Sequence, residues 1–476
     1  MNVVLAALNR NTIYTPLALL YLRACISRDR ELAGKADVEL KEFELSDSCE
    51  YIVWEIVRRA PGVVAFSCYL WNISLILRLS AMLKQVLPGA VIVLGGPEVS
   101  PRAHEIIAQN PAVDIVIRGE GEFAFVEAVK AIKAGKGLSG IKGLTFRMGR
   151  KVIENPERPP IKNLDSIPSV YLDGCTAVAH REACLETQRG CVFGCEFCYY
   201  NKGCRTWRKF GLARVRRELA FLLSQSDVTV YLMDPVFNID LKRAKEICRF
   251  IIERNRHHAP FHTEIQAELV DAELASLLKK ADMRYVEVGL QSVDKGVLGR
   301  ARRPFDRERF VKGFNLLKDA GLVVELQLIL GLPGDTLEKF KESLEFALRL
   351  DPPVLSVFKL QVLPGTGIRR DAARLGLKFD REPPYEFIES PTMPLADSIH
   401  CQKIVNSISL FRRDPSALAC CRREGITLVG LIERWLRQMP SDGILLNGED
   451  NRALAREARI FSRSLNIKRQ NRRDTL

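Results

Sequence analysis

The sequence predicts an α/β protein with two successive parallel sheets, a doubly wound sheet and then a partial (βα)6 barrel, followed by a helical C-terminal region. Three observations predict this. Strand-like and helix-like runs alternate over residues 1–135, the same alternation returns over residues 181–372, and residues 373–476 show helical periodicity. Alternating strands and helices are typical of parallel sheets whose faces are covered by helices.

The first unit, residues 1–135, ends several of its strands in small residues. We expect strands at residues 3–8, 38–45, 63–67, 90–94 and 113–117, and helices at residues 17–26 and 73–86. Glycine-bearing loops follow the last two strands, at Gly95-Gly96-Pro97 and at Gly119-Glu120. Ligands of such sheets bind beyond the carboxyl ends of the strands, so these loops predict one site. The chain contains neither GxGxxG after the first strand nor GxxxxGK[ST], which disfavours a nucleotide there.

Residues 136–180 are predicted to connect the two units, because proline and glycine punctuate them. A short hairpin is expected at residues 144–153. The second unit then begins near residue 181, with strands at residues 183–187, 228–233, 261–267, 285–290, 323–330 and 354–362. Six such units are too few to close an eight-unit barrel. Function is expected at the carboxyl ends of these strands, where polar or glycine-rich residues recur.

Three cysteines follow the first strand of the second unit at CxxxCxxC spacing, Cys191, Cys195 and Cys198. Three thiolates satisfy three irons of a cubane cluster and leave the fourth iron open to a non-protein ligand. A zinc site remains an alternative, with Cys204 or Cys184 as the fourth ligand. Inert buried cysteines are a further alternative. A disulfide framework is disfavoured, because a chain of 476 residues with 13 cysteines and no secretory leader fits a reducing, cytoplasmic and anaerobic setting.

The cysteine spacing after a strand resembles the radical S-adenosylmethionine (SAM) superfamily, over about residues 183–368. In that family the open iron holds SAM, and the resemblance implies a [4Fe-4S] cluster on Cys191, Cys195 and Cys198. It also implies SAM contacts at the ends of later strands. These are Tyr199 near the adenine, Gln291 and Ser292 near the ribose, Gly331 and Gly334 in the turn beneath the adenine, and Glu268 near the amino group or the ribose. Gln327 departs from the family, which often carries an acidic residue at that position.

Residues 1–132 resemble the Rossmann-like cobalamin-binding domain found ahead of many radical SAM cores. The resemblance rests on four strand-end segments, and it implies cobalamin contacts at Tyr14 and Thr15, at Ser67 and Leu70, at Gly95, Gly96 and Pro97, and at Gly119 and Glu120. Small residues there let the backbone approach a large corrin. The DxHxxG arrangement is absent, and His104 lies in the wrong place for it, so we expect cobalamin without a histidine ligand on its lower face. The loop at residues 14–17 is the expected neighbour of that face.

Charge and hydropathy bear on whether the chain is a nucleic-acid-binding, membrane or secreted protein. The net charge is +13, with a basic run at residues 468–473, yet no recognition motif with interleaved aromatics accompanies it, so nucleic acid is not the favoured partner. No apolar run reaches the roughly 20 residues of a membrane span. The apolar N-terminus has no basic flank and is interpreted as a strand rather than a signal peptide.

The C-terminal region, residues 373–476, is predicted to be a helical cap over the barrel mouth, with amphipathic runs at residues 404–411 and 426–439. Its opening, Pro383-Pro384-Tyr385-Glu386-Phe387, resembles the start of a C-terminal domain in a poorly characterised cobalamin-linked subgroup. We expect substrate selection to lie here.

Taken together, the resemblances imply a cobalamin-dependent radical SAM methyltransferase that alkylates an unactivated carbon. The acceptor is left open between a peptide or protein, a natural-product intermediate and a lipid, with a slight preference from the basic charge for a protein or an anionic acceptor. An electron donor such as flavodoxin or ferredoxin is the implied partner. Two alternatives remain: a non-methylating rearrangement, ring contraction or cyclisation with the same cofactors, and a cobalamin or redox sensor that binds nucleic acid through its basic tail.

Overall fold

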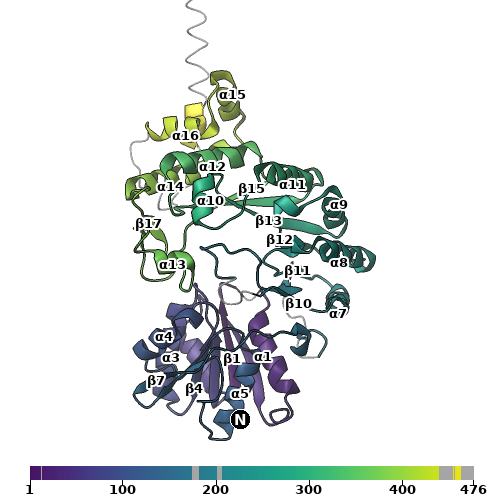
Figure 1. The fold of residues 1–476 in the computed structure, drawn as a ribbon, viewed down its shortest axis with the longest axis vertical. Helices are drawn as coiled ribbons and strands as arrows, with labels where there is room; N and C mark the ends of the chain where they lie inside the picture. Colours follow the sequence, from purple (N-terminus) through teal and green to yellow (C-terminus); the bar gives the residue numbers. More distant parts are fainter. Residues whose placement is uncertain (12, 174–181, 201–205, 439–453, 455, 463–476) are drawn as a thin grey trace, which may run out of the picture.

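A computed structural model describes the chain except for residues 12, 174–181, 201–205, 439–453, 455 and 463–476. The described residues form two lobes, each built on one large sheet (Figure 1). The N-terminal lobe, purple and blue in Figure 1, lies below the barrel lobe, which carries the C-terminal helices on its far side.

The first sheet has the strand order β2-β1-β3-β4-β5-β6-β7, and its first five strands are parallel. Alternate residues of β1 pack on opposite faces, so both faces of the sheet are covered by helices. The strands are β1 (Asn2–Asn9), β2 (Asp37–Glu44), β3 (Val63–Ser67), β4 (Val91–Gly95), β5 (Ile115–Ile117), β6 (Leu144–Met148) and β7 (Lys151–Glu154). The helices are α1 (Leu17–Arg28), α2 (Cys49–Val57), α3 (Ile73–Val86), α4 (Ala103–Gln109) and α5 (Glu122–Lys133), with the 3-10 turn η1 (Ser100–Arg102).

The hairpin expected at residues 144–153 forms as β6 and β7. The hairpin is not part of the linker between the two units, where it was expected. Instead β6 pairs antiparallel with β5, so the hairpin extends the first sheet. The first lobe therefore continues past residue 135.

The second sheet has the order β15-β14-β13-β12-β11-β8, with every neighbouring pair parallel. This is the predicted six-stranded partial barrel. Its strands are β8 (Glu182–Leu185), β11 (Thr229–Leu232), β12 (Phe261–Glu264), β13 (Met283–Gln291), β14 (Val323–Leu330) and β15 (Val354–Lys359). Alternation again separates two faces: Val286, Val288 and Leu290 are fully buried in the core, whereas Tyr285, Glu287 and Gln291 are half-buried and line the lumen.

Helices follow these strands, and most of them cover the outer face of the partial barrel, whereas the short helix of residues 367–371 lies close to the first lobe (Figure 1). They are α7 (Leu212–Leu223), α8 (Leu241–Arg254), α9 (Ala272–Lys280), α10 (Lys295–Arg300), α11 (Arg307–Asp319), α12 (Leu337–Arg349) and α13 (Gly367–Asp371). Short elements join them: η2 (Leu164–Ser166), β9 (Gln188–Arg189), β10 (Arg208–Lys209), η3 (Phe237–Ile239), η4 (Ala267–Leu269), β16 (Lys378–Phe379) and β17 (Phe387–Glu389).

The C-terminal helices are α14 (Leu395–Phe411), α15 (Pro415–Glu424) and α16 (Leu428–Leu436). Both α14 and α16 pack against α12, on the outer layer of the barrel (Figure 1). The expected helical cap is thus corrected: these helices do not cover the barrel mouth, because their apolar stripes are buried against α12. The basic run at residues 468–473 lies outside the described residues. None of the helices in the described part of the chain combines the length and the apolar character needed to cross a bilayer.

Candidate functional site

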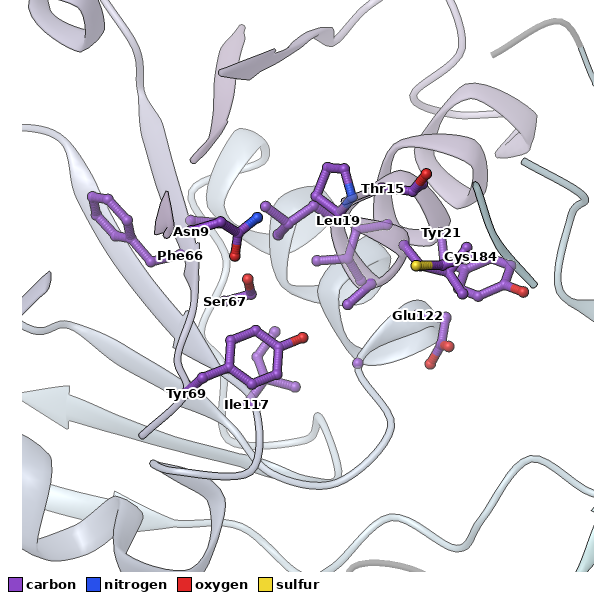
Figure 2. A pocket seen from close by; sticks show the side chains of 18 of the residues that line it. Asn9, Thr15, Leu19, Tyr21, Phe66, Ser67, Tyr69, Ile117, Glu122 and Cys184 are labelled. Carbon is purple, nitrogen blue, oxygen red and sulfur yellow. The ribbon is translucent and has the colours of Figure 1, made fainter. Parts of the chain in front are cut away.

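A cavity of about 630 Å³ lies at the carboxyl ends of β1, β3, β4 and β5, where the first sheet meets the barrel. Figure 2 shows Asn9, Ser67 and Tyr69, which come from the ends of β1 and β3. Leu19 and Tyr21 of α1 line it as well. The barrel supplies a further wall through residues of β8, β11 and the loops after them, namely Cys184, Glu186, Arg189, Tyr231 and Met233. The cavity therefore joins the two lobes.

Most of the residues predicted for this site line the cavity: Tyr14, Thr15, Ser67, Gly95, Gly96, Gly119 and Glu120. Leu70 and Pro97 do not belong to the lining. His104 is exposed on α4, and no histidine is found among the described residues that line the cavity.

The residues present fit a corrin. Gly96 has φ +114°, and a Cβ there would lie 2.5 Å from the carbonyl oxygen of Cys68, so only glycine lets this loop pass the end of β3. Apolar side chains of α1, β3 and α5, among them Leu17, Phe66 and Phe125, provide flat contact area. One carboxylate oxygen of Glu122 is buried in this region without a hydrogen-bond partner, and it can accept a hydrogen bond from a ligand.

Glu120 has a second use that its position in the loop did not predict. Its carboxylate lies 2.9 Å from Arg208 and 3.2 Å from Arg189, and it also accepts the backbone N–H of Ile161. Burial by itself raises the pKa of Glu120, but these partners lower it by more, so the pKa lies below its ordinary value. Glu122 lies 2.6 Å from Arg189. Arg189 stands two residues before Cys191, so these pairs fasten the loop that carries the cysteines to the first lobe.

The cysteine loop begins at a buried aspartate. Asp234, at the end of β11, accepts the backbone N–H of Thr187 at 2.8 Å and that of Gln188 at 3.1 Å, and the Thr187 hydroxyl also donates to it. Burial raises the pKa of Asp234 to about 7 in spite of these donors. Farther on, the backbone N–H of Glu196 donates to Ala301 and its carbonyl accepts from Ile368, so the loop is held at its start and between Cys195 and Cys198.

The three thiols lie close enough to interact electrostatically. Burial, and after it the charges of Cys195 and Cys191, raise the pKa of Cys198 to about 12. Burial also raises the pKa of Cys191. The described residues contain no group of three or more His, Cys, Asp or Glu compact enough for a single metal ion. Three thiols in one loop are the donor set of a cubane cluster with one open iron. Cys184 lines the cavity instead, and Cys204 lies outside the described residues.

A row of carboxylates crosses the lumen beside the cysteine loop. The strand register places Glu264 of β12 beside Glu287 of β13, and Glu287 beside Glu325 of β14. Two of them have neutral hydrogen-bond partners: Gln327 donates to Glu287 at 2.8 Å, and Tyr285 donates to Glu325. Burial, and then the charge of Glu287, raise the pKa of Glu264 to about 8. The charge of Arg303 acts on Glu264 and partly offsets the rise of its pKa. Like charges in register are destabilising, so this row favours a positively charged ligand.

The predicted SAM contacts are distributed around this lumen. Gln291 follows a register shift in β13, has φ +67°, and keeps its buried side-chain oxygen without a partner. Such a bulge re-aims a side chain at a site. Ser292 instead faces α12, where its hydroxyl lies 3.3 Å from that of Ser343. Glu268 accepts from Gln266 at 2.6 Å on η4.

Gly331, Gly334 and Tyr199 complete the predicted set, at the carboxyl ends of the strands. Gly331 and Gly334 both have positive φ, +91° and +80°. A Cβ on Gly331 would overlap the ring of Phe387. Burial raises the pKa of Tyr199 to about 12.

Sequence reasoning missed the lumen row. The lumen row consists of Glu264, Glu287 and Glu325. Each lies inside a strand, where a single glutamate is normally interpreted as a solvent-exposed residue. The alternation of side chains along each strand could have shown the row, because all three glutamates point to the same face of neighbouring parallel strands.

Comparisons with known proteins agree with this geometry. A family model described as the B12 binding domain matches residues 3–129, and one described as the Radical SAM superfamily matches residues 185–347. An uncharacterized methyltransferase of Pyrococcus horikoshii is 25% identical over 358 residues, which are 74% of this chain and 77% of that protein. The cobalamin-dependent radical SAM methyltransferase TokK of Streptomyces tokunonensis is 26% identical over 402 residues, 80% of this chain and 58% of TokK.

A solved structure shares the fold. That structure, of the cobalamin-dependent S-adenosylmethionine radical enzyme OxsB with aqua-cobalamin and S-adenosylmethionine bound, superposes with a TM-score of 0.69 at 15% identity. The superposition covers 99% of this chain and 80% of OxsB. The chain spans less than two thirds of TokK, the second of the two sequence relatives described.

The fold and the site agree with a radical SAM domain preceded by a B12 binding domain, the two families whose models this chain matches. Its two domains support cobalamin, a [4Fe-4S] cluster and SAM as cofactors.

Proposed function

We propose that this protein is a cobalamin-dependent radical SAM C-methyltransferase. The observation that carries the proposal is the placement of the cavity, which is lined by the first sheet on one side and by β8 and β11 of the barrel on the other. A methyl donor bound there would face the barrel lumen. When bound, the cluster and SAM supply a radical that removes hydrogen from a carbon, and methylcobalamin supplies the methyl group.

The chain's own residues would bind and orient these groups. Cys191, Cys195 and Cys198 would hold the cluster. Glu264 and Glu287 would face the positively charged ammonium and sulfonium groups of SAM, and Gln291 would offer its free carbonyl oxygen to a ribose hydroxyl. Bound cofactors and substrate that fill the lumen would exclude water from the reacting carbon, which protects a radical from side reactions.

The charge of the lumen bears on the acceptor. The basic net charge of the chain gave a slight preference for a protein or an anionic acceptor, but the surfaces that enclose the reaction carry carboxylates. An acceptor whose reacting end is neutral or positively charged suits this lumen better than an anionic one. A peptide or protein and a small molecule both remain acceptors of this kind.

The test is an anaerobic labelling experiment. Cluster-reconstituted protein with cobalamin, a reductant of the flavodoxin or ferredoxin class and methyl-deuterated SAM is mixed with host extract, and protein and small-molecule fractions are analysed by mass spectrometry. Each methylated carbon should appear together with one S-adenosylhomocysteine and one 5′-deoxyadenosine, from two molecules of SAM and two electrons.

The alternatives give different results. 5′-Deoxyadenosine without S-adenosylhomocysteine or transferred label would favour a rearrangement. No SAM cleavage together with salt-dependent binding of DNA or RNA would favour the sensor. Label in a peptide or in a metabolite would decide between the two acceptor classes.

A further inference from the structure

A short segment after the barrel contacts loops of both lobes. Residues 385–387 lie antiparallel to residues 360–362, which follow β15: the backbone N–H of Val362 donates to Tyr385 at 2.9 Å, and that of Phe387 donates to Leu360 at 2.8 Å. Tyr385 and Phe387 are fully buried, and Tyr385 has φ +57°. A bulky residue rarely adopts such a φ, so the surroundings hold this segment in place. We call residues 385–387 the bridging segment.

One end of the bridging segment contacts the loop of the cobalamin cavity. The Tyr385 hydroxyl donates to the carboxylate of Glu98 at 2.5 Å, across 287 positions of sequence. Glu98 is only 4% exposed and lies three residues after Gly95, which lines the cavity. Arg102 lies 2.8 Å from the same carboxylate oxygen, and the backbone N–H of Glu98 reaches Cys68 at the end of β3. Tyr385 thus bonds to the loop that shapes the cavity.

The other end contacts the loop proposed to lie beneath the SAM adenine. The ring of Phe387 occupies the space that a Cβ on Gly331 would fill. Phe387 therefore packs directly under the turn of residues 331–334. Tyr385 contacts Glu98 and Phe387 contacts Gly331, so one segment holds both loops at once.

The same cavity loop meets the barrel at one more place. A Cβ on Gly365 would lie 2.7 Å from the ring of Tyr199 and 2.8 Å from Pro101, so three loops touch at this glycine. One of them, the loop of Tyr199, carries the cysteines. The close approach shows that little space separates the cavity loop from the barrel mouth.

We propose that the bridging segment sets the distance between the bound cobalamin and the bound SAM, and that Tyr385 and Phe387 are positioning residues. The inference rests on the proposed function, because it concerns the spacing of the two cofactors in one reaction. The contacts of these two side chains described above are with loops, Glu98 in the cavity loop and Gly331 in the turn of residues 331–334. Their effect is on geometry, and displacement of reacting groups by about 1 Å can lower a rate by about 100-fold.

The matched variants are Tyr385→Phe, Glu98→Gln and Ser407→Ala. Tyr385→Phe removes the hydroxyl and keeps the ring. Glu98→Gln removes the charge but leaves an amide oxygen that accepts the same hydrogen bond. Ser407→Ala removes a buried hydroxyl that donates to the backbone of Lys403 in α14, away from both cofactor loops, and serves as the control for loss of a buried hydrogen bond.

The first readout needs no turnover. In anaerobic holoprotein with cob(II)alamin, electron spin relaxation is measured with the cluster oxidised and then reduced, since the added relaxation depends on the separation of the two centres. Wild type, Glu98→Gln and Ser407→Ala should give one narrow component, and Tyr385→Phe a broadened or displaced one.

The second readout is the yield of transferred label per 5′-deoxyadenosine, measured on the acceptor fraction that wild type labels. Tyr385→Phe should lower this ratio about tenfold while SAM cleavage stays within about twofold, because the donor is misplaced and the cleavage site is intact. The proposal would be overturned if Tyr385→Phe gave the same spin relaxation and the same label yield as Ser407→Ala. It would also be overturned if Glu98→Gln changed these two quantities as much as Tyr385→Phe does. Absence of label with wild type would instead contradict the methyl-transfer function, and the relaxation readout would still decide on the bridging segment.

Discussion

The cavity of the first lobe and the lumen of the barrel would hold their ligands by different means. The cavity is shaped by glycine loops and apolar side chains, and its polar contacts come largely from strand ends. The lumen presents a row of glutamates from three neighbouring strands. A large, rigid corrin suits a site defined by shape, whereas a small cation such as SAM suits a site defined by charge. Substitutions should therefore separate the two sites cleanly.

Loss of the cluster should have the largest effect. Cys195→Ala removes one of three thiolates, so the cluster should be lost and SAM cleavage should fall to background, while cobalamin binding in the other lobe persists. Iron and sulfide content, 5′-deoxyadenosine formation and cobalamin retention measure this. Cys248→Ala, at a fully buried cysteine of α8, is the control and should keep the cluster. Unchanged SAM cleavage in Cys195→Ala would refute the cluster assignment.

A glycine substitution should affect the cavity alone. Gly96→Ala places a Cβ against the carbonyl oxygen of Cys68, so cobalamin affinity should fall at least about tenfold, with SAM binding unchanged. Gly34→Ala is the matched control: Gly34 also has positive φ, +69°, but no atom lies within 4 Å of its Cβ position. That control should lose about 1 kcal/mol of stability and no cobalamin affinity. Equal cobalamin affinities in the two variants would contradict the conclusion that the shape of the glycine loop defines the cobalamin site.

Neutralising the lumen should give the reverse pattern. Glu264→Gln keeps the shape and removes the carboxylate, so SAM affinity measured above about pH 8, where Glu264 is ionised, should fall about tenfold, the amount expected for one charge-assisted contact. Cobalamin affinity should not change. Isothermal titration calorimetry of the reconstituted protein measures both, with Glu308→Gln on the exposed face of α11 as the control. A loss of cobalamin affinity in Glu264→Gln would show that the two sites are not separate.

The last prediction concerns the pH dependence of the stability of the apoprotein. Burial raises the pKa of Glu264 to about 8 from an ordinary value of 4.5, so the folded chain binds this proton more tightly than the unfolded chain. This contribution to stability is present below about pH 4.5 and is lost as pH rises to about 8, at no more than about 1.4 kcal/mol per pH unit. Denaturant titrations of wild type and Glu264→Gln between these limits should differ in slope. Parallel curves would show that Glu264 is not held in its neutral form.

The sequence predicted the strands of both sheets and the strand-end loops of the cavity, among them Gly95, Gly96 and Gly119, because local patterns encode them. Apolar runs of strand length ended by Gly95-Gly96 or Gly119 are visible without any tertiary information. The lumen row was not visible in this way, because Glu264, Glu287 and Glu325 are far apart in sequence and only strand register brings them together. The packing of α14 and α16 on α12 was not predicted, for a similar reason. An amphipathic stripe shows that a helix packs against another element, but it does not show which element.

Two predicted residues found different partners in the structure. Ser292 lies in the motif at the end of β13, but the register shift there turns its hydroxyl toward Ser343. Glu120 was predicted for cobalamin, and its carboxylate is engaged by Arg208 and Arg189 while it lines the cavity. Motif position alone does not reveal such competition between ligand and protein partners.

The loop after β1 pairs with the first strand of the barrel, and this pairing bears on how the barrel lobe folds. The Thr15 hydroxyl and backbone N–H both donate to the carbonyl of Glu182, and Tyr14 forms a parallel bridge with the same residue. The loop thereby covers part of the open edge of β8, and exposed strand edges promote association between chains. During synthesis the first lobe emerges before β8 and can shield that edge as it appears. A barrel lobe expressed without the first lobe should therefore aggregate, which makes the cobalamin domain a folding partner as well as a cofactor site.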